Sequence, residues 1–154
     1  MRTLPLVSLL LLAGAPNSTQ DIWGTWTMNP SRSRLGPQDA GAITVRIEPH
    51  AKGEVFTYER TGPNGRATLF SVVLYFDGQE RSSQSHGCAG TLHSRRLEDG
   101  VVEIVWRCQG GSSIRFVRRR TNTDDMVLDE TEHQPNRAAV ERRLVLEKQR
   151  AERR

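Results

Sequence analysis

The sequence is poor in cysteine and in aromatic residues, and it has no long apolar run. Of its 154 residues, 2 are cysteines, and aromatic residues make up 6%. A helix that spans a bilayer needs about 20 consecutive apolar residues. The longest apolar stretch, from Leu4 to Ala13, is about half that length, so we expect no membrane-spanning segment in the mature chain.

Motifs for metal binding and for catalysis are also missing. There is no Cys-x-x-Cys pair, and the four histidines do not show metal-ligand spacing. Gly-x-Ser-x-Gly, a phosphate-binding loop and His-Glu-x-x-His do not occur. The sequence therefore predicts no catalytic residue, no metal site and no cofactor.

The charge of the chain is close to balanced. Lysine and arginine number 22 and acidic residues 18, for a net charge of +4, and nearly all the basic residues are arginine. A charge this small, spread along the chain, gives little attraction for a polyanion. We therefore do not expect a nucleic-acid partner.

The N-terminus has the layout of a secretory signal peptide. Arg2 supplies a positive charge, the apolar stretch follows, and small residues come next. We assign residues 1–20 to the signal and place the start of the mature chain between Ala15 and Asp21. A buried N-terminal helix is the alternative. The signal predicts export to a periplasmic or extracellular compartment.

Cys88 and Cys108 are predicted to form a disulfide, because an exported chain with two cysteines folds in an oxidising compartment. The register of the surrounding hairpin presents a difficulty. A two-residue turn at Asp99-Gly100 leaves the two cysteines three positions out of alignment. A β-bulge, or a fold-back of Cys88, has to close that gap.

Most of the mature chain reads as short strands separated by turns. Ile43, Val45 and Ile47 alternate with polar residues, which is typical of a half-buried strand. Asp99-Gly100 is the clearest hairpin signal. Expected strands cover residues 24–28, 43–48, 55–60, 68–76, 79–85 (short, at an edge), 91–97, 101–108, 114–119, 126–132 and 138–147. This spacing favours an antiparallel barrel or a sandwich.

The last expected strand is the most ambiguous. The Ala, Glu, Arg and Leu content of residues 138–147 favours a helix. Apolar residues at even positions favour a strand instead, and we choose the strand. Residues 148–154 are assigned to a charged, frayed tail.

Residues 24–26, Gly-Thr-Trp, resemble the Gly-x-Trp of the first strand in lipocalins and fatty-acid-binding proteins. With Asn29, Ser33 and the segment 74–78, Leu-Tyr-Phe-Asp-Gly, the chain is similar to a family of uncharacterised exported bacterial lipocalin-like proteins. The resemblance implies an up-and-down barrel of about 8–10 strands over residues 21–147. It implies that Trp26 closes one end, and Arg118 or Arg142 is the candidate to pack over its ring.

The same resemblance implies that the barrel binds a small, partly apolar molecule. The residues expected to contact the ligand are Trp26, Val45, Ile104, Trp106 and Phe116. The alternative is an envelope or extracellular interaction protein with a filled barrel and a protein partner on its outer surface. An enzyme is a third possibility. A cavity of about 300–1,000 Å³ would favour the ligand.

Three groups of residues combine reactive or charged types, and we interpret each of them as structural. Residues 85–88, Ser-His-Gly-Cys, combine reactive types but read as a polar loop. Glu59 and Glu80 are not brought together by any pattern. The arginine-rich run 114–120 reads as a solvated strand face whose charges pair with the acidic residues that follow.

Export predicts that the mature protein begins between Ala15 and Asp21. Protein recovered from its native host should show this start by N-terminal sequencing, because signal peptidase removes the apolar segment. An intact Met1 on the exported protein, or a purely cytosolic location, would contradict the prediction.

Overall fold

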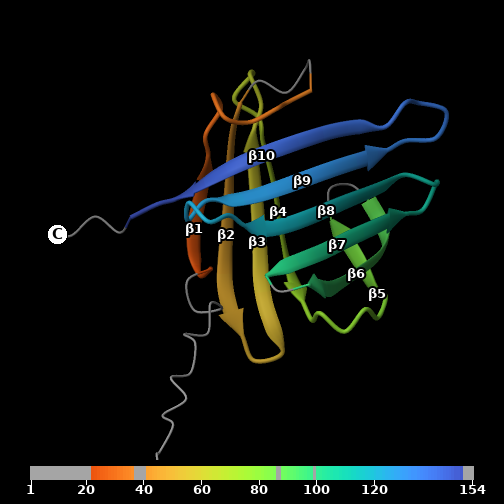
Figure 1. Ribbon diagram of the computed structural model, residues 1–154. Coiled ribbons are helices and arrows are strands. Elements are labelled where there is room, and N and C mark those ends of the chain that lie inside the picture. Colours follow the sequence, from red (N-terminus) through yellow and green to blue (C-terminus); the bar gives the residue numbers. More distant parts are fainter. Residues whose placement is uncertain (1–21, 37–40, 86–87, 99, 151–154) are drawn as a thin grey trace, which may run out of the picture.

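A computed structural model describes residues 22–36, 41–85, 88–98 and 100–150 (Figure 1). This part of the chain contains ten β-strands and no helix. In particular, none of its segments is a helix long and apolar enough to cross a membrane. The strands are β1 (Gly24–Met28), β2 (Ala42–His50), β3 (Gly53–Thr61), β4 (Ala67–Leu74), β5 (Arg81–Ser85), β6 (Cys88–Glu98), β7 (Val101–Cys108), β8 (Ser113–Arg120), β9 (Met126–His133) and β10 (Val140–Lys148).

The ten strands form one antiparallel sheet that curls into a barrel-like shape. Its order is β4-β3-β2-β1-β10-β9-β8-β7-β6-β5, so chain neighbours are sheet neighbours and the first strand pairs with the last. Strands β4 and β5 are the two edges of the sheet. This confirms the prediction of an all-β, up-and-down, lipocalin-like barrel.

The two least certain strands are both present. The polar segment after Phe76 contains β5, which lies at an edge as expected. The last segment is a strand and not a helix, since β10 pairs with β9 along its length from Val140 to Leu146. It runs through Lys148, and the Gln149 amide donates a hydrogen bond to the Thr25 carbonyl. Ordered structure thus continues into the segment that was assigned to the tail.

The inward faces of the strands follow the alternation in the sequence. Ile43, Val45 and Ile47 on β2 are at most 1% exposed, and the inward residues of β7 are equally buried. Aromatic rings fill the centre of the barrel, with centroid separations from 4.9 Å to 6.2 Å. These rings belong to Phe56, Tyr58, Phe70, Trp106 and Phe116. The middle of the barrel is therefore packed with side chains.

Trp26 is fully buried on β1, as predicted. Its indole Nε1 donates a hydrogen bond of 2.9 Å to the Ile22 carbonyl oxygen. Gly24 has a φ of +122°, which disfavours any residue with a side chain. The glycine of the Gly-Thr-Trp motif therefore serves the backbone bend that leads into β1.

The cation over the Trp26 ring is Lys148, whose Nζ lies 5.6 Å from the ring centroid. The expectation of Arg118 or Arg142 in this role is corrected, because each pairs with an acid inside the barrel. Lys148 reaches the ring because β1 and β10 are paired with Trp26 opposite Lys148.

The predicted disulfide between Cys88 and Cys108 is present, with Cα atoms 5.2 Å apart. A register shift between Arg96 and Glu98 aligns Gly90 with Cys108. This bulge takes up one of the three positions of misalignment. The remaining two are spanned at the strand end, where the Gln109 amide donates to the Ala89 carbonyl.

Replacing Trp26 with Ala should destabilise the protein by about 3–5 kcal/mol, the usual cost of deleting a large buried aromatic side chain. Leu69→Ala is the control, because Leu69 is 63% exposed on β4, and its cost should stay within about 0.5 kcal/mol. Equilibrium denaturation measures both. Equal, small costs would show that Trp26 is not part of the core.

Candidate functional site

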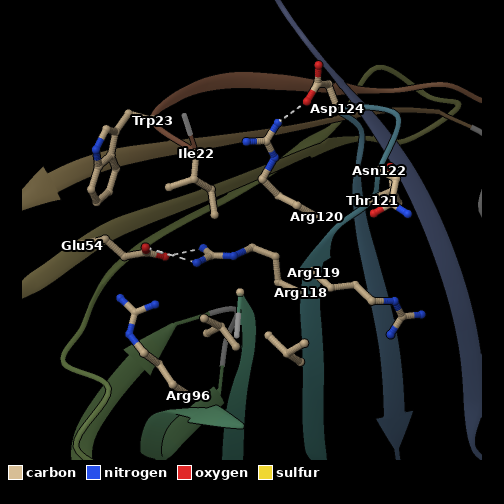
Figure 2. Close-up of a pocket in the computed structure, with 13 residues that line it drawn as sticks. Ile22, Trp23, Glu54, Arg96, Arg118, Arg119, Arg120, Thr121, Asn122 and Asp124 are labelled. Carbon is tan, nitrogen blue, oxygen red and sulfur yellow. Dashed lines mark hydrogen bonds and ion pairs between the residues drawn. The ribbon is translucent and has the colours of Figure 1, made fainter. Parts of the chain in front are cut away.

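A cavity of about 430 Å³ lies at the end of the barrel where β1 begins. Its walls come from the segment before β1, the start of β3, the turn between β6 and β7, and the turn between β8 and β9 (Figure 2). The lining residues are Ile22, Trp23, Glu54, Arg96, Gly100, Val101, Val102, Arg118, Arg119, Arg120, Thr121, Asn122 and Asp124.

A buried ion pair crosses the barrel beneath this cavity. The Arg118 side chain comes from β8 and the Glu54 side chain from β3, and they are 1% and 2% exposed. Both terminal nitrogens of Arg118 donate to the carboxylate, one of them over 3.1 Å to Glu54 Oε2. Figure 2 shows the two side chains meeting, with Ile22 and Trp23 on one side of the pair and Arg96 on the other.

The third nitrogen of that guanidinium makes no hydrogen bond within the described part of the chain. Arg118 Nε is buried and has no hydrogen-bond partner there. A buried donor left without an acceptor costs about 1–3 kcal/mol. This nitrogen lies inside the packed interior, because almost none of its surface is accessible to solvent.

The two sides of the cavity differ in character. Ile22 and Trp23 supply an apolar wall that also packs on the core, and Val101 and Val102 face the cavity from β7. Arg96 stands on the β6 side, and in Figure 2 its guanidinium points toward Glu54. Among the described residues Arg96 has no acidic partner.

Arg96 is held by an aromatic ring. Its guanidinium carbon lies 4.3 Å from the centroid of the Phe76 ring. Phe76 has a φ of +59°, and its amide donates a 3.1 Å hydrogen bond to Ser94 Oγ on β6. The segment 74–78, which the sequence singled out, thus folds over β6 and fixes the arginine beside the cavity.

The remaining charges at the cavity pair with acids. Arg120 donates to Asp124 over 2.8 Å at the rim. Arg119 donates to Asp129 over 2.6 Å, and Figure 2 shows its guanidinium directed away from Glu54 and Arg118. The groups facing the cavity are thus Arg96, Arg118, Arg120, Glu54 and Asp124, which leaves one positive charge uncompensated.

A second ion pair lies inside the barrel, beside the Tyr58 ring. Arg142 on β10 donates to Glu130 on β9 over 2.9 Å, and the Tyr58 hydroxyl lies 3.5 Å from the same carboxylate. Burial raises the pKa of Glu130, and Arg142 opposes that shift. Each of these two interior arginines therefore already holds a carboxylate of the chain itself.

The five predicted ligand contacts lie in the packed core. Trp26, Val45, Ile104, Trp106 and Phe116 are each at most 2% exposed, and none lines the cavity. Their role as ligand contacts stays a prediction, since a ligand that reached them would have to displace part of the core.

The arginine-rich run is only in part the solvated strand face that the sequence indicated, because Arg118 is buried and pairs with Glu54. Arg115 donates to Glu103 over 2.8 Å, while Arg119 and Arg120 pair with acids that follow in the chain.

The other two groups do not form a site in the described structure. Glu59 is exposed on β3, while Glu80 pairs with Arg107. His86 and Gly87 lie outside the described residues, as does Asp99 of the hairpin turn. Within the described ranges no group of three or more His, Cys, Asp and Glu is placed to hold a metal ion.

Sequence reasoning missed Glu54 and the pairing of Arg118 with it. Both continue a period-two pattern: Glu54 precedes Phe56 and Tyr58 on the same face, and Arg118 follows Phe116. Each charged residue is two positions from an inward aromatic residue on the same strand, and this spacing could have identified it as inward-facing. Arg96 gave no such signal, because its position depends on the bulge and on Phe76.

Comparisons with known proteins support the fold. No family model matches the chain, and no curated protein matches it. Among solved structures, a fatty acid binding protein of Schistosoma mansoni in complex with arachidonic acid matches with a TM-score of 0.55 at 10% identity. The match covers 84% of this chain and 99% of that one. The chain thus has the barrel fold of a fatty-acid-binding protein.

Proposed function

We propose that this protein is an exported binding protein that holds a small, partly apolar molecule in the cavity beside Trp23. The cavity itself is the observation that carries the proposal. Its volume of about 430 Å³ falls within the range of about 300–1,000 Å³ that is common for small-molecule sites. An apolar wall with a few converging polar groups is also typical of such sites.

The position of the cavity limits what can bind. The aromatic rings fill the barrel centre, and the Arg118–Glu54 pair closes the floor of the cavity. A ligand therefore sits at the end of the barrel. The solved neighbour was obtained with arachidonic acid, whereas the filled centre here favours a shorter molecule.

The filled centre is also what the alternative, an interaction protein with a packed barrel, expects. The end cavity separates the two functions, because a barrel that serves as a scaffold for a protein partner does not need an apolar recess with a buried cation at its floor. The filled centre fits both functions, but the end cavity favours ligand binding.

Export is supported by the apolar N-terminal segment and by the bond between Cys88 and Cys108. Disulfides persist in oxidising compartments and are rare in a reducing cytosol. The location remains part of the proposal.

Filling the cavity should abolish binding. Val101→Trp places a large side chain in the recess, while Val105→Trp on the same strand lies away from it and serves as the matched control. The probes are 1-naphthoate and its neutral analogue 1-naphthylmethanol, titrated by calorimetry. We expect saturable binding of at least one probe, lost in Val101→Trp and kept in Val105→Trp.

Thermal unfolding of both variants checks that each is folded. The proposal is wrong if neither probe binds the unaltered protein, or if Val101→Trp binds as well as Val105→Trp. Oleate serves as a size test, and tighter binding of oleate than of either naphthyl probe would place the ligand in the barrel centre.

A further inference from the structure

We propose that the protein forms a two-fold dimer in which the open edge of β4 pairs antiparallel with the β4 edge of a second copy. This contact is independent of the ligand in the end cavity, so the inference goes beyond the proposed function. Three observations carry it: the edge is unprotected, its side chains match one another in one antiparallel register, and the nearest charges lie outside the contact.

The free side of β4 is open to solvent. In the described sheet β4 pairs with β3 on one side, and its other side presents backbone N–H and C=O groups without a neighbouring strand. Figure 1 shows β4 and β5 standing apart above the segment that joins them. Thr68 is directed to the inner face, in phase with the buried Phe70, yet Thr68 is exposed. The described sheet therefore leaves room beside β4 for another strand.

Strand β4 also lacks the features with which natural proteins block an open edge, namely charges, proline, bulges or short length. Strand β5 has them, since it is five residues long and begins with Arg81. The eight residues of β4 include no charge, proline or glycine, and their register with β3 is unbroken from Ala67 to Leu74. Leu69 on the outer face is 63% exposed, the most exposed large hydrophobic residue among those described. An edge of this kind is a template for pairing with a further strand.

The sequence of β4 is complementary to itself when Ser71 lies opposite the partner's Ser71. Leu69 then lies opposite the partner's Val73, and Val73 opposite the partner's Leu69, so aliphatic side chains meet on the outer face. Between them the Ser71 hydroxyl, which is 2.9 Å from the Thr57 hydroxyl on β3, meets its own equivalent. Hydroxyl pairs and aliphatic pairs directly opposite one another are the contacts that stabilise antiparallel strands.

The neighbouring registers do not match in this way. A two-fold axis through the sheet keeps outer-face residues opposite outer-face residues, so the register can shift only in steps that preserve the alternation along the strand. A register centred on Phe70 places Ser71 opposite the partner's Leu69, and one centred on Val72 places it opposite the partner's Val73. Both put a hydroxyl against an aliphatic side chain. The register centred on Ser71 is therefore the one that we expect.

The charges nearest to this edge favour a second copy as the partner. On β3, Glu59 lies beside Leu69 and Val55 beside Val73. In the dimer each row across the junction runs from Glu59 through Leu69 to the partner's Val73, so the two Glu59 carboxylates fall in different rows and do not meet. An uncharged edge offers no attraction to a charged peptide, whereas pairing with its own copy brings no like charges together. Two-fold contacts of this self-complementary type are the commonest in soluble oligomers.

Sedimentation equilibrium of the protein between about 1 μM and 1 mM measures the association. A contact limited to two strand edges is small, so we expect a dissociation constant on the order of 10–100 μM. Leu69→Lys places on the edge a charge of the kind that blocks natural edges, and it should raise the dissociation constant tenfold or more. Leu97→Lys is the matched control, because it makes the same change at a leucine that is 41% exposed on β6, and it should leave the constant within twofold.

Cross-linking tests the register. Ser71→Cys places two thiols on opposed residues, whose Cα atoms lie about 4.5–5.5 Å apart in antiparallel pairs, a separation that a disulfide spans. Leu69→Cys separates the thiols by four residues along the strands, about 13 Å. Diamide oxidises two thiols to a disulfide and is itself reduced to the hydrazine. Ser71→Cys should form the covalent dimer at least tenfold faster than Leu69→Cys, although Leu69 is 63% exposed.

Each outcome bears on one proposal. A monomer mass up to 1 mM overturns the dimer, as does equal weakening by Leu69→Lys and Leu97→Lys, or faster cross-linking of Leu69→Cys than of Ser71→Cys. If thermal unfolding shows that Leu69→Lys is not folded, the two cysteine variants decide. No residue of β4 is among those that line the end cavity, so Leu69→Lys should bind the naphthyl probes as the unaltered protein does. Failure of those probes to bind refutes the proposed function and leaves the dimer standing.

Discussion

The ion pair between Arg118 and Glu54 determines how the interior of this barrel is used. It joins β8 to β3 across the barrel, so it fixes the separation of two walls that share no backbone hydrogen bonds in the sheet order. Burying two charges is costly, and such a pair adds little net stability over apolar residues. Losing one partner is costly as well, about 3–5 kcal/mol. The pair therefore acts mainly as a constraint on geometry, and its two side chains line the end cavity.

The aromatic rings and the second pair, Arg142 with Glu130, complete this arrangement. The interior holds two ion pairs and a packed group of aromatic rings. Likeness in fold to a fatty-acid-binding protein therefore does not extend to an open interior. The same sheet topology accommodates a large cavity or a filled one, depending on the side chains that the strands direct inward.

Much of this fold could be predicted from the sequence, because a period of two along each strand determines which residues face inward. That pattern predicted the strand Ile43–Ile47. The turn before Val101 was predicted from Asp99-Gly100, and the burial of Trp26 was implied by the resemblance to lipocalins. Periodicity does not say which inward residue meets which across the barrel. Glu54 and Arg118 are 64 residues apart, and their contact depends on the register of every strand between them. The position of Lys148 over Trp26 depends likewise on closure between β1 and β10. The site is formed by contacts between strands on opposite sides of the barrel. It was missed because the sequence pattern indicates only which face of its own strand each residue occupies.

Because the first strand pairs with the last, the sheet is completed only when the C-terminal strand β10 is in place. Asn29 and Glu147 are hydrogen-bonded over a separation of 118 residues, and contacts between such distant segments form slowly because a long loop must be ordered first. Until β10 has emerged from the ribosome, β1 and β9 each present an unpaired edge that invites pairing with other chains. A chain that lacks β10 would keep both edges open for its lifetime. Loss of the segment from Val140 onward would then appear as aggregation, even though most of the residues that line the cavity lie far away in sequence.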